Sequence, residues 1–310
     1  MSSDVALMAR GAEAVRVAGY SHFALAVQDI AEAKAFYTDV LGLRWIGTDL
    51  LPDCGRHGVA SAGARQLVAL CDGPARPELA TTGIHYAFRV SAAGRERILQ
   101  RVQERGIAVH RYKEDRPAED ADNVYFCDPF GNRLQLVLGA DTSSAPVIGI
   151  DHAAVQAIDV EWEEKFYLSH LGLARDHVVG WRTADYARAR LWGEGKEDMA
   201  PGTRRWDKRY TAMHGRDPVP RPNVQLFVKT GDGILGVYLA TEHIQEPPEE
   251  QVVGVPRLAF TVAREDIERL AERLADWGPT VGPVAHPASS PRRISVYAKD
   301  PGGNFLEFCC

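Results

Sequence analysis

The sequence has 310 residues, a length that favours about two domains, and its 45% hydrophobic and 25% charged residues are ordinary for a globular protein. A formal net charge of −6 gives no electrostatic reason to expect nucleic acid or an anionic membrane as a partner, so we expect a small-molecule substrate. Five cysteines without a Cys-x-x-Cys spacing suit a reducing compartment, and no secretory segment or long apolar run is present, so we expect a cytoplasmic protein.

Two sets of internal repeats organise the chain. His22, Phe36-Tyr37 and Leu41-Gly42-Leu43 recur 130 residues later as His152, Phe166-Tyr167 and Leu171-Gly172-Leu173. A turn phrase, Asp128-Pro129-Phe130-Gly131-Asn132, recurs 172 residues later as Asp300-Pro301-Gly302-Gly303-Asn304. Pro presets φ, Gly accepts a positive φ and Asn tolerates the left-handed region, so each phrase predicts a tight turn before a strand.

The repeats divide the chain into four modules at about 17–75, 80–140, 147–246 and 252–310, each read as strand, helix and three strands. In the second module we predict strands at 85–90, 110–113, 123–126 and 133–138, and a helix at 91–105 that stops at Gly106. The two repeat spacings differ, which predicts an insertion within about 175–222. This stretch contains several basic and aromatic residues, and we interpret it as a solvated excursion rather than as a lid that clamps an anionic substrate.

The first strand of each module has one small face and one bulky face. The small faces begin with His22, His85, His152 and Arg257, and an alanine follows two residues later in all four. The bulky face must pack on the helix, whereas the small face suits a cavity with its first residue aimed inward. In the strands after the turn phrases, Gln135 and Glu307 point away from the apolar side chains.

Modules with these histidines, with Phe-Tyr-x3-Leu-Gly-Leu at the helix end and with Asp-Pro-x-Gly-Asn before the last strand resemble the vicinal oxygen chelate superfamily. That superfamily includes glyoxalase I, extradiol dioxygenases, certain epimerases and fosfomycin- or bleomycin-resistance proteins. The resemblance implies an α+β fold in which four βαβββ modules pair into two cupped-sheet domains. It covers nearly the whole chain and is specific for the fold, but not for the reaction.

The resemblance also implies metal ligands on the first and last strands of each module. Carried over to this sequence, the metal ligands are His22, His85, Gln135, His152 and Glu307, with Ala69 and Tyr238 at the remaining last-strand positions. The cofactor would be a divalent ion, Fe²⁺, Mn²⁺, Zn²⁺ or Ni²⁺. The protein would be a monomer or homodimer.

Two ways of pairing the modules remain open. Consecutive pairing, as in extradiol dioxygenases, gives domains at 17–140 and 147–310. The first would hold His22, His85 and Gln135, and the second would hold His152 and Glu307, with Arg257 intruding. Pairing of the first module with the fourth, as in fused glyoxalase-type chains, places His85 and Gln135 with His152, and His22 with Glu307 and Arg257. His85 and Gln135 share a site in both arrangements.

Arg257 stands where a second histidine is expected, and a guanidinium is not a metal ligand. We interpret it as an ion-pair partner of Glu307, or as a substrate-binding residue together with Arg89. Tyr125 and Tyr297 precede the turn phrases at positions where extradiol enzymes often place a catalytic tyrosine. The leading hypothesis is a divalent-metal enzyme acting on a small substrate with vicinal oxygens, as a dioxygenase or as an isomerase, epimerase or lyase. The alternative is a metal-free binding or resistance protein of the same fold.

Overall fold

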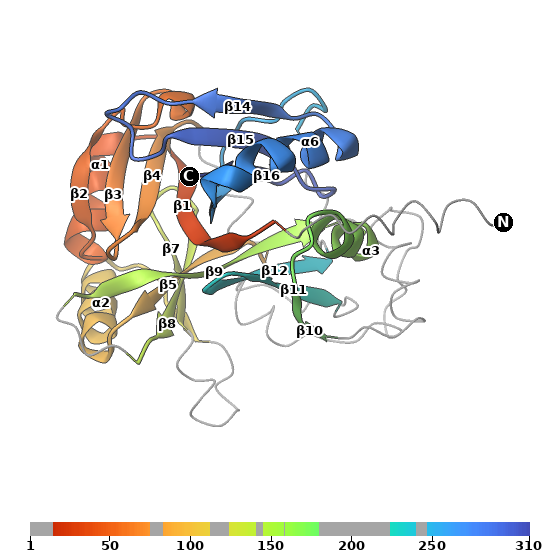
Figure 1. The fold of residues 1–310 in the computed structure, drawn as a ribbon. Coiled ribbons are helices and arrows are strands. Elements are labelled where there is room, and N and C mark those ends of the chain that lie inside the picture. Colours follow the sequence, from red (N-terminus) through yellow and green to blue (C-terminus); the bar gives the residue numbers. More distant parts are fainter. Residues whose placement is uncertain are drawn as a thin grey trace, which may run out of the picture.

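The computed structural model describes residues 15–74, 83–111, 124–140, 145–157, 159–179, 224–239 and 247–310. These residues form two eight-stranded sheets, one above the other in the view of Figure 1. Sheet A has the strand order β14-β15-β16-β13-β1-β4-β3-β2, and sheet B has the order β10-β11-β12-β9-β5-β8-β7-β6.

Each sheet combines strands from both halves of the chain. The strands of sheet A are β1 (Val17–Val27), β2 (Arg44–Thr48), β3 (His57–Ala62), β4 (Gln66–Asp72), β13 (Arg257–Val262), β14 (Val281–Ala285), β15 (Ile294–Lys299) and β16 (Phe305–Cys309). Those of sheet B are β5 (His85–Val90), β6 (His110–Arg111), β7 (Val124–Cys127), β8 (Arg133–Leu138), β9 (Val147–Ala157), β10 (Arg175–Val179), β11 (Gln225–Thr230) and β12 (Gly233–Leu239).

One short helical segment or helix follows the first strand of every module. These are α1 (Ile30–Ala35) continuing into the π-helical turn η2 (Phe36–Val40), α2 (Ala92–Glu104), α3 (Val160–Glu164) continuing into η5 (Lys165–His170), and η6 (Arg264–Asp266) continuing into α6 (Ile267–Trp277). A further 3-10 turn, η3 (Pro52–Cys54), lies between β2 and β3. Ser91 caps α2 by accepting a hydrogen bond from the Gly94 amide, and Gly106, where the sequence predicts the helix to stop, follows with φ 68°.

The sheets show which modules pair. First strands meet in antiparallel pairs, β1 with β13 and β5 with β9, so the first module joins the fourth and the second joins the third. This is the glyoxalase-type arrangement of the two that the sequence left open. The sequence ranges 17–140 and 147–310 therefore do not correspond to the two sheets.

The bulky faces of the first strands build the shared core, as their alternation predicts. Phe23 of β1 and Phe88 of β5 are fully buried in one apolar cluster, and their ring centroids lie 6.0 Å apart. The small faces point away from this core. We call them the cup faces, and they hold the candidate site residues.

The repeated turn phrases fasten one sheet to the other. Tyr37 of η2 donates a hydrogen bond to Asp128 at 2.9 Å, and Tyr167 of η5 donates to Asp300 at 2.8 Å. In the same way Asn132 and Asn304 donate, each at 2.9 Å, to backbone carbonyls of β1 and β9. The turn phrases are thus buried contacts between the sheets as well as turns. This explains why burial raises the pKa of both aspartates to about 6.

The structure narrows where the predicted insertion can begin. Residues 175–179 are strand β10, which pairs with β11 as the module pattern requires, so the insertion cannot begin before residue 180. Residues 180–223 lie outside the described part of the chain, and the solvated excursion stays a prediction.

Candidate metal centre

The strand register defines the four ligand positions of sheet B. On each first strand, the ligand position is the first cup-face residue, His85 or His152. On each last strand, it is the residue that pairs with the first-strand alanine, Ala87 or Ala154, two residues after that histidine. Gln135 lies opposite Ala87, but the residue opposite Ala154 is Gly236. The alignment of Tyr238 with this position was therefore wrong by two residues: Tyr238 lies opposite Gln156.

His85 and His152 converge across the β5–β9 pair. Their Nε2 atoms lie 3.1 Å apart, and the ring planes are 87° apart. The Nδ1 atom of His85 lies 2.7 Å from the Gly83 carbonyl oxygen, and that of His152 lies 2.8 Å from an Asp151 carboxylate oxygen. Both oxygens accept hydrogen bonds, so each Nδ1 carries the proton, and a neutral ring then directs its Nε2 lone pair at the other ring.

The charges around the pair favour this tautomer. Burial, His152 and Arg133 together lower the pKa of His85 well below its usual value, so His85 is neutral at neutral pH. Burial would raise the pKa of Asp151, but the hydrogen bond from His152 and the charge of Arg89 lower it, so Asp151 is a carboxylate. Its second oxygen accepts a hydrogen bond from Arg89 Nε at 2.9 Å.

These residues fit a divalent cation. Two imidazole ligands of one ion, each at about 2.1 Å and at roughly right angles, place their nitrogens about 3.0 Å apart, close to the distance observed between His85 and His152. Gln135 is 2% exposed, and its Oε1 atom is buried without a hydrogen-bond partner among the described residues. A buried amide oxygen without a donor is costly, and a cation would satisfy it. Gly236 offers no side chain, so three protein ligands are available.

Aromatic and basic side chains surround the pair. Tyr125 packs edge-on against His85 with ring centroids 5.3 Å apart, and the Arg133 guanidinium lies 5.2 Å from the centroid of the Tyr125 ring. Of the two substrate-binding candidates, Arg89 is part of this site through Asp151. Asp151 and Arg133 were missed from the sequence, although Asp151 directly precedes a predicted ligand.

Sheet A has a different centre, formed by a buried ion-pair network. Arg257 Nε donates to Glu307 Oε2 at 3.0 Å, as predicted for this arginine, and Arg292 pairs with Oε1 of the same carboxylate. Both arginines also pair with Asp53 of η3. Ser295 adds a hydrogen bond to Glu307 Oε1 at 2.8 Å. Both Glu307 oxygens are therefore held by donors, and two guanidinium groups replace the charge of a cation.

His22 lies against this network. Its Nε2 is 3.3 Å from Glu307 Oε2, outside hydrogen-bond geometry, and with Cys309 the two residues form a compact group of potential metal ligands. Burial and the charges of Arg292 and Arg257 lower the pKa of His22 well below its usual value. The same charges oppose a divalent ion, so His22 and Glu307 fit a metal poorly while Arg257 and Arg292 are in place.

The cup face of sheet A is filled by the chain itself. Leu51 and Cys54 pack with Ala24 and Ala69, the latter at the last-strand ligand position. Burial would raise the pKa of Asp53, but Arg257 and Arg292 lower it to about 2, so it stays ionised. Tyr297 lies in this closed centre, with its ring centroid 5.3 Å from Arg257. Sequence reasoning missed Asp53 and Arg292, because neither lies in a repeated motif.

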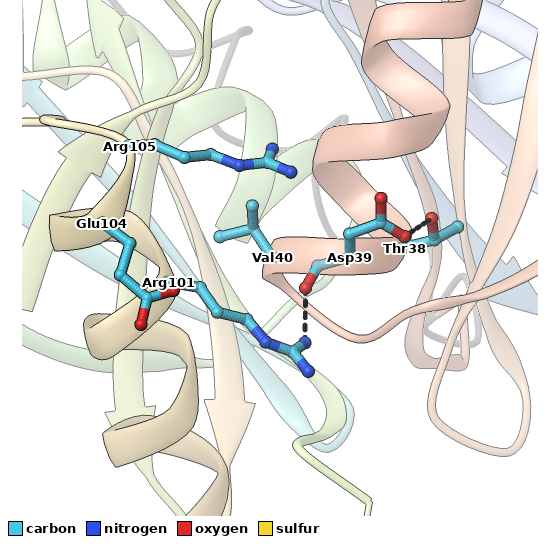
Figure 2. A pocket seen from close by; sticks show the side chains of 6 residues that line it. All are labelled: Thr38, Asp39, Val40, Arg101, Glu104 and Arg105. Atoms are coloured by element: carbon cyan, nitrogen blue, oxygen red, sulfur yellow. Dashed lines mark hydrogen bonds between the residues drawn. The ribbon is translucent and has the colours of Figure 1, made fainter.

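A surface hollow exists away from both cups. Figure 2 shows it between η2 and α2, where the first two modules meet and Arg101 donates a hydrogen bond to the Asp39 carbonyl. Its lining residues are Thr38, Asp39, Val40, Arg101, Glu104 and Arg105. No candidate site residue lines it, so we do not assign the metal centre to this hollow.

Comparisons with known proteins agree with this architecture. A family model described as Glyoxalase/Bleomycin resistance protein/Dioxygenase superfamily matches residues 19–136. The glutathione transferase FosA of Serratia marcescens is 30% identical over 126 residues, which are 39% of this chain and 80% of that protein.

Solved structures match over most of the chain. A putative dioxygenase from Bacillus subtilis has a TM-score of 0.62 at 13% identity, covering 96% of this chain and 86% of that one. Glyoxalase I from Zea mays has a TM-score of 0.55 at 15% identity, covering 94% and 92%. At these identities the likeness concerns the fold.

The chain belongs to the glyoxalase, bleomycin resistance protein and dioxygenase superfamily, as its repeats predicted. That superfamily includes metal-dependent glyoxalases, dioxygenases and fosfomycin-resistance enzymes. Among the described residues, no helix is long and apolar enough to cross a membrane.

Proposed function

We propose that this protein is a divalent-metal enzyme with one metal centre, built on sheet B from His85, His152 and Gln135. The observation that carries the proposal is the 3.1 Å approach of two Nε2 atoms whose rings are both oriented by an acceptor at Nδ1. Two such lone pairs repel each other unless a cation or a proton lies between them. The orphaned Gln135 oxygen supports a cation.

Each residue has a role in this proposal. His85, His152 and Gln135 hold the ion, and Asp151 fixes the ring of His152 as carboxylates do for metal-bound histidines. When bound, a divalent ion supplies Lewis acidity toward two vicinal oxygens of a small substrate. Tyr125 and Arg133 lie beside His85 and would contact the substrate or take part in proton transfer. Arg89 holds Asp151 in its charged form.

The ligand set favours an isomerase, epimerase or lyase over an extradiol dioxygenase. Oxygen-activating Fe(II) sites of this kind use two histidines and one carboxylate. Sheet B supplies a neutral amide instead, and Glu307 of sheet A is bound by two arginines. Oxygen consumption by the metal-loaded protein with catechols tests this choice, and the proposal expects none.

A metal-free binding protein is the rival, and Asp151 is the observation in its favour. A carboxylate 2.8 Å from His152 would stabilise a protonated ring, which would donate a hydrogen bond from Nε2 to His85. In that case a proton, and no metal, holds the two histidines together.

Metal titration separates the two. We expect purified, tag-free protein to bind one equivalent of Zn²⁺, Ni²⁺, Mn²⁺ or Fe²⁺ by calorimetry. His85→Ala should abolish this binding, whereas the matched variant His22→Ala in sheet A should leave it. If the wild type binds none of the four ions, or if both variants behave alike, the metal centre on sheet B is wrong.

A further inference from the structure

Among the described residues, the cup face of sheet B holds a second buried side-chain amide without a hydrogen-bond partner, that of Gln156. Gln156 of β9 is 4% exposed, and neither its amide oxygen nor its amide nitrogen has a hydrogen-bond partner among the described residues. Leaving both a donor and an acceptor buried and unpaired destabilises the unliganded fold. Such a group therefore indicates a site where a ligand completes the hydrogen bonds.

Gln156 shares the cup face with the metal centre. His152, Ala154 and Gln156 alternate along β9 on this face, while Ala153, Val155 and Ala157 pack in the core. Four residues of strand separate the Cα atoms of His152 and Gln156 by roughly 13 Å. Between them lie Ala154 and its neighbour Gly236, and the ring of Phe227 on β11 lies 3.3 Å from where a Cβ of Gly236 would stand, so this stretch of the cup face is apolar.

The two residues next to Gln156 in the described strand register are polar and uncharged. In the strand register its neighbour on β12 is Tyr238, and the next residue, on β11, is Gln225. Both have interactions of their own, whereas neither atom of the Gln156 amide has a hydrogen-bond partner among the described residues. The backbone carbonyl of Gln156 is already held by Asn304, which fixes the strand without using the side chain.

We propose that Gln156 recognises a carboxamide at the far end of an elongated substrate whose vicinal oxygens lie at His85 and His152. This inference rests on the proposed metal centre. A carboxamide offers one donor and one acceptor side by side and so pairs with both amide atoms of Gln156. A carboxylate offers only acceptors and would leave the oxygen of Gln156 unpaired. The substrate class is thus a chelating head joined by an apolar or small spacer to an uncharged amide tail.

Hydroxamates provide the probes, because they chelate divalent metals through two vicinal oxygens. We would compare acetohydroxamate, octanohydroxamate, and the monohydroxamate monoamides of adipic, suberic and sebacic acids on the metal-loaded protein by calorimetry. At least one amide-tailed probe should bind about tenfold or more tighter than octanohydroxamate. Gln156→Leu should remove that preference while acetohydroxamate binds both proteins alike.

Stability gives a second readout. Gln156→Leu removes an unpaired amide and should raise the Tm of the unliganded protein. Gln66→Leu is the matched control, since Gln66 Oε1 accepts a hydrogen bond from the Ile150 amide at 2.6 Å and its loss should lower the Tm.

The outcomes distinguish this inference from the proposed function. If acetohydroxamate binds the metal-loaded protein but no amide tail improves binding, or if Gln156→Leu keeps the preference, Gln156 has no recognition role and the metal centre stands. If the protein takes up no metal and binds no hydroxamate, both proposals are overturned.

Discussion

Nε2 of His85 and Nε2 of His152 lie 3.1 Å apart, and the partners of the two rings leave no proton on either nitrogen when both rings are neutral. In the other sheet Arg257 occupies the position equivalent to His85 and reaches the carboxylate of Glu307. One cup thus presents the two nitrogens of the proposed metal centre, whereas the other cup contains the positive charge of Arg257 and Arg292.

Gln135→Glu should strengthen metal binding. A carboxylate in place of the amide adds a negative charge to the ligand set and should lower the metal Kd by about tenfold or more. Competition with a chromophoric chelator measures this change. Gln156→Glu makes the same substitution farther along the cup face and should have a much smaller effect; equal effects would mean that Gln135 is not a ligand.

Asp151→Asn should weaken metal binding by about 10- to 100-fold without unfolding the protein, because the carboxylate orients His152. The control is Asp176→Asn, which removes a similar contact of 2.7 Å to the neighbouring, exposed His177. Metal affinity should be unchanged in that control. A loss of affinity in neither variant would contradict the orienting role of Asp151.

Arg257→Leu should destabilise the fold by about 3–5 kcal/mol, since it leaves buried carboxylates with one partner fewer. Chemical denaturation measures the loss. Arg56→Leu, which breaks an exposed 2.8 Å pair with Asp72, should change the free energy of unfolding by about 1 kcal/mol or less. Metal binding on sheet B should survive in both variants, and its loss in Arg257→Leu alone would argue that sheet A contributes to the centre.

His22 should make the stability depend on pH. Its pKa in the folded state is well below 6.5, whereas the unfolded chain takes up a proton near pH 6.5. The stabilisation is therefore present above pH 6.5 and is lost as the pH falls from 6.5 toward the folded-state pKa.

His22→Gln should remove this dependence. Between pH 6 and pH 5 the free energy of unfolding of the wild type should fall more steeply than that of the variant, by about 1.4 kcal/mol per pH unit. Identical slopes would show that His22 takes up its proton equally in both states.

Tyr37→Phe and Tyr167→Phe should each destabilise the protein by about 1.5–3 kcal/mol, because each removes a hydrogen bond to a buried carboxyl group that joins the sheets. Tyr297→Phe is the control. Its hydroxyl has at most a weak contact with Ser295 of its own strand and joins no second sheet, so its removal should cost less than the loss of either inter-sheet hydrogen bond. Thermal unfolding of the three variants checks the order.

The sequence predicted what is local or repeated. The turn phrases gave the strands that carry Gln135 and Glu307, and alternation gave the inward histidines, because both depend on neighbouring residues alone. The pairing of modules could not be predicted, since all four modules offer the same edges. Tyr238 was misplaced because its strand lacks the turn phrase that sets the register elsewhere.

Contacts between residues far apart in the chain could not be predicted from the sequence either. Asp53 and Arg257 are 204 residues apart in the chain and meet only through the tertiary fold. Arg292 likewise reaches Glu307 from a loop without a repeated motif. The chemical difference between the two cups therefore depends on long-range contacts that no local sequence pattern predicts.

Anomalous diffraction from crystals grown with Ni²⁺ or Zn²⁺ tests the central claim most directly. The account predicts one strong anomalous peak per chain, bound by Nε2 of His85, Nε2 of His152 and the side-chain oxygen of Gln135. A peak bound by His22 and Glu307 instead, or none between the two histidines at saturating metal, would contradict it.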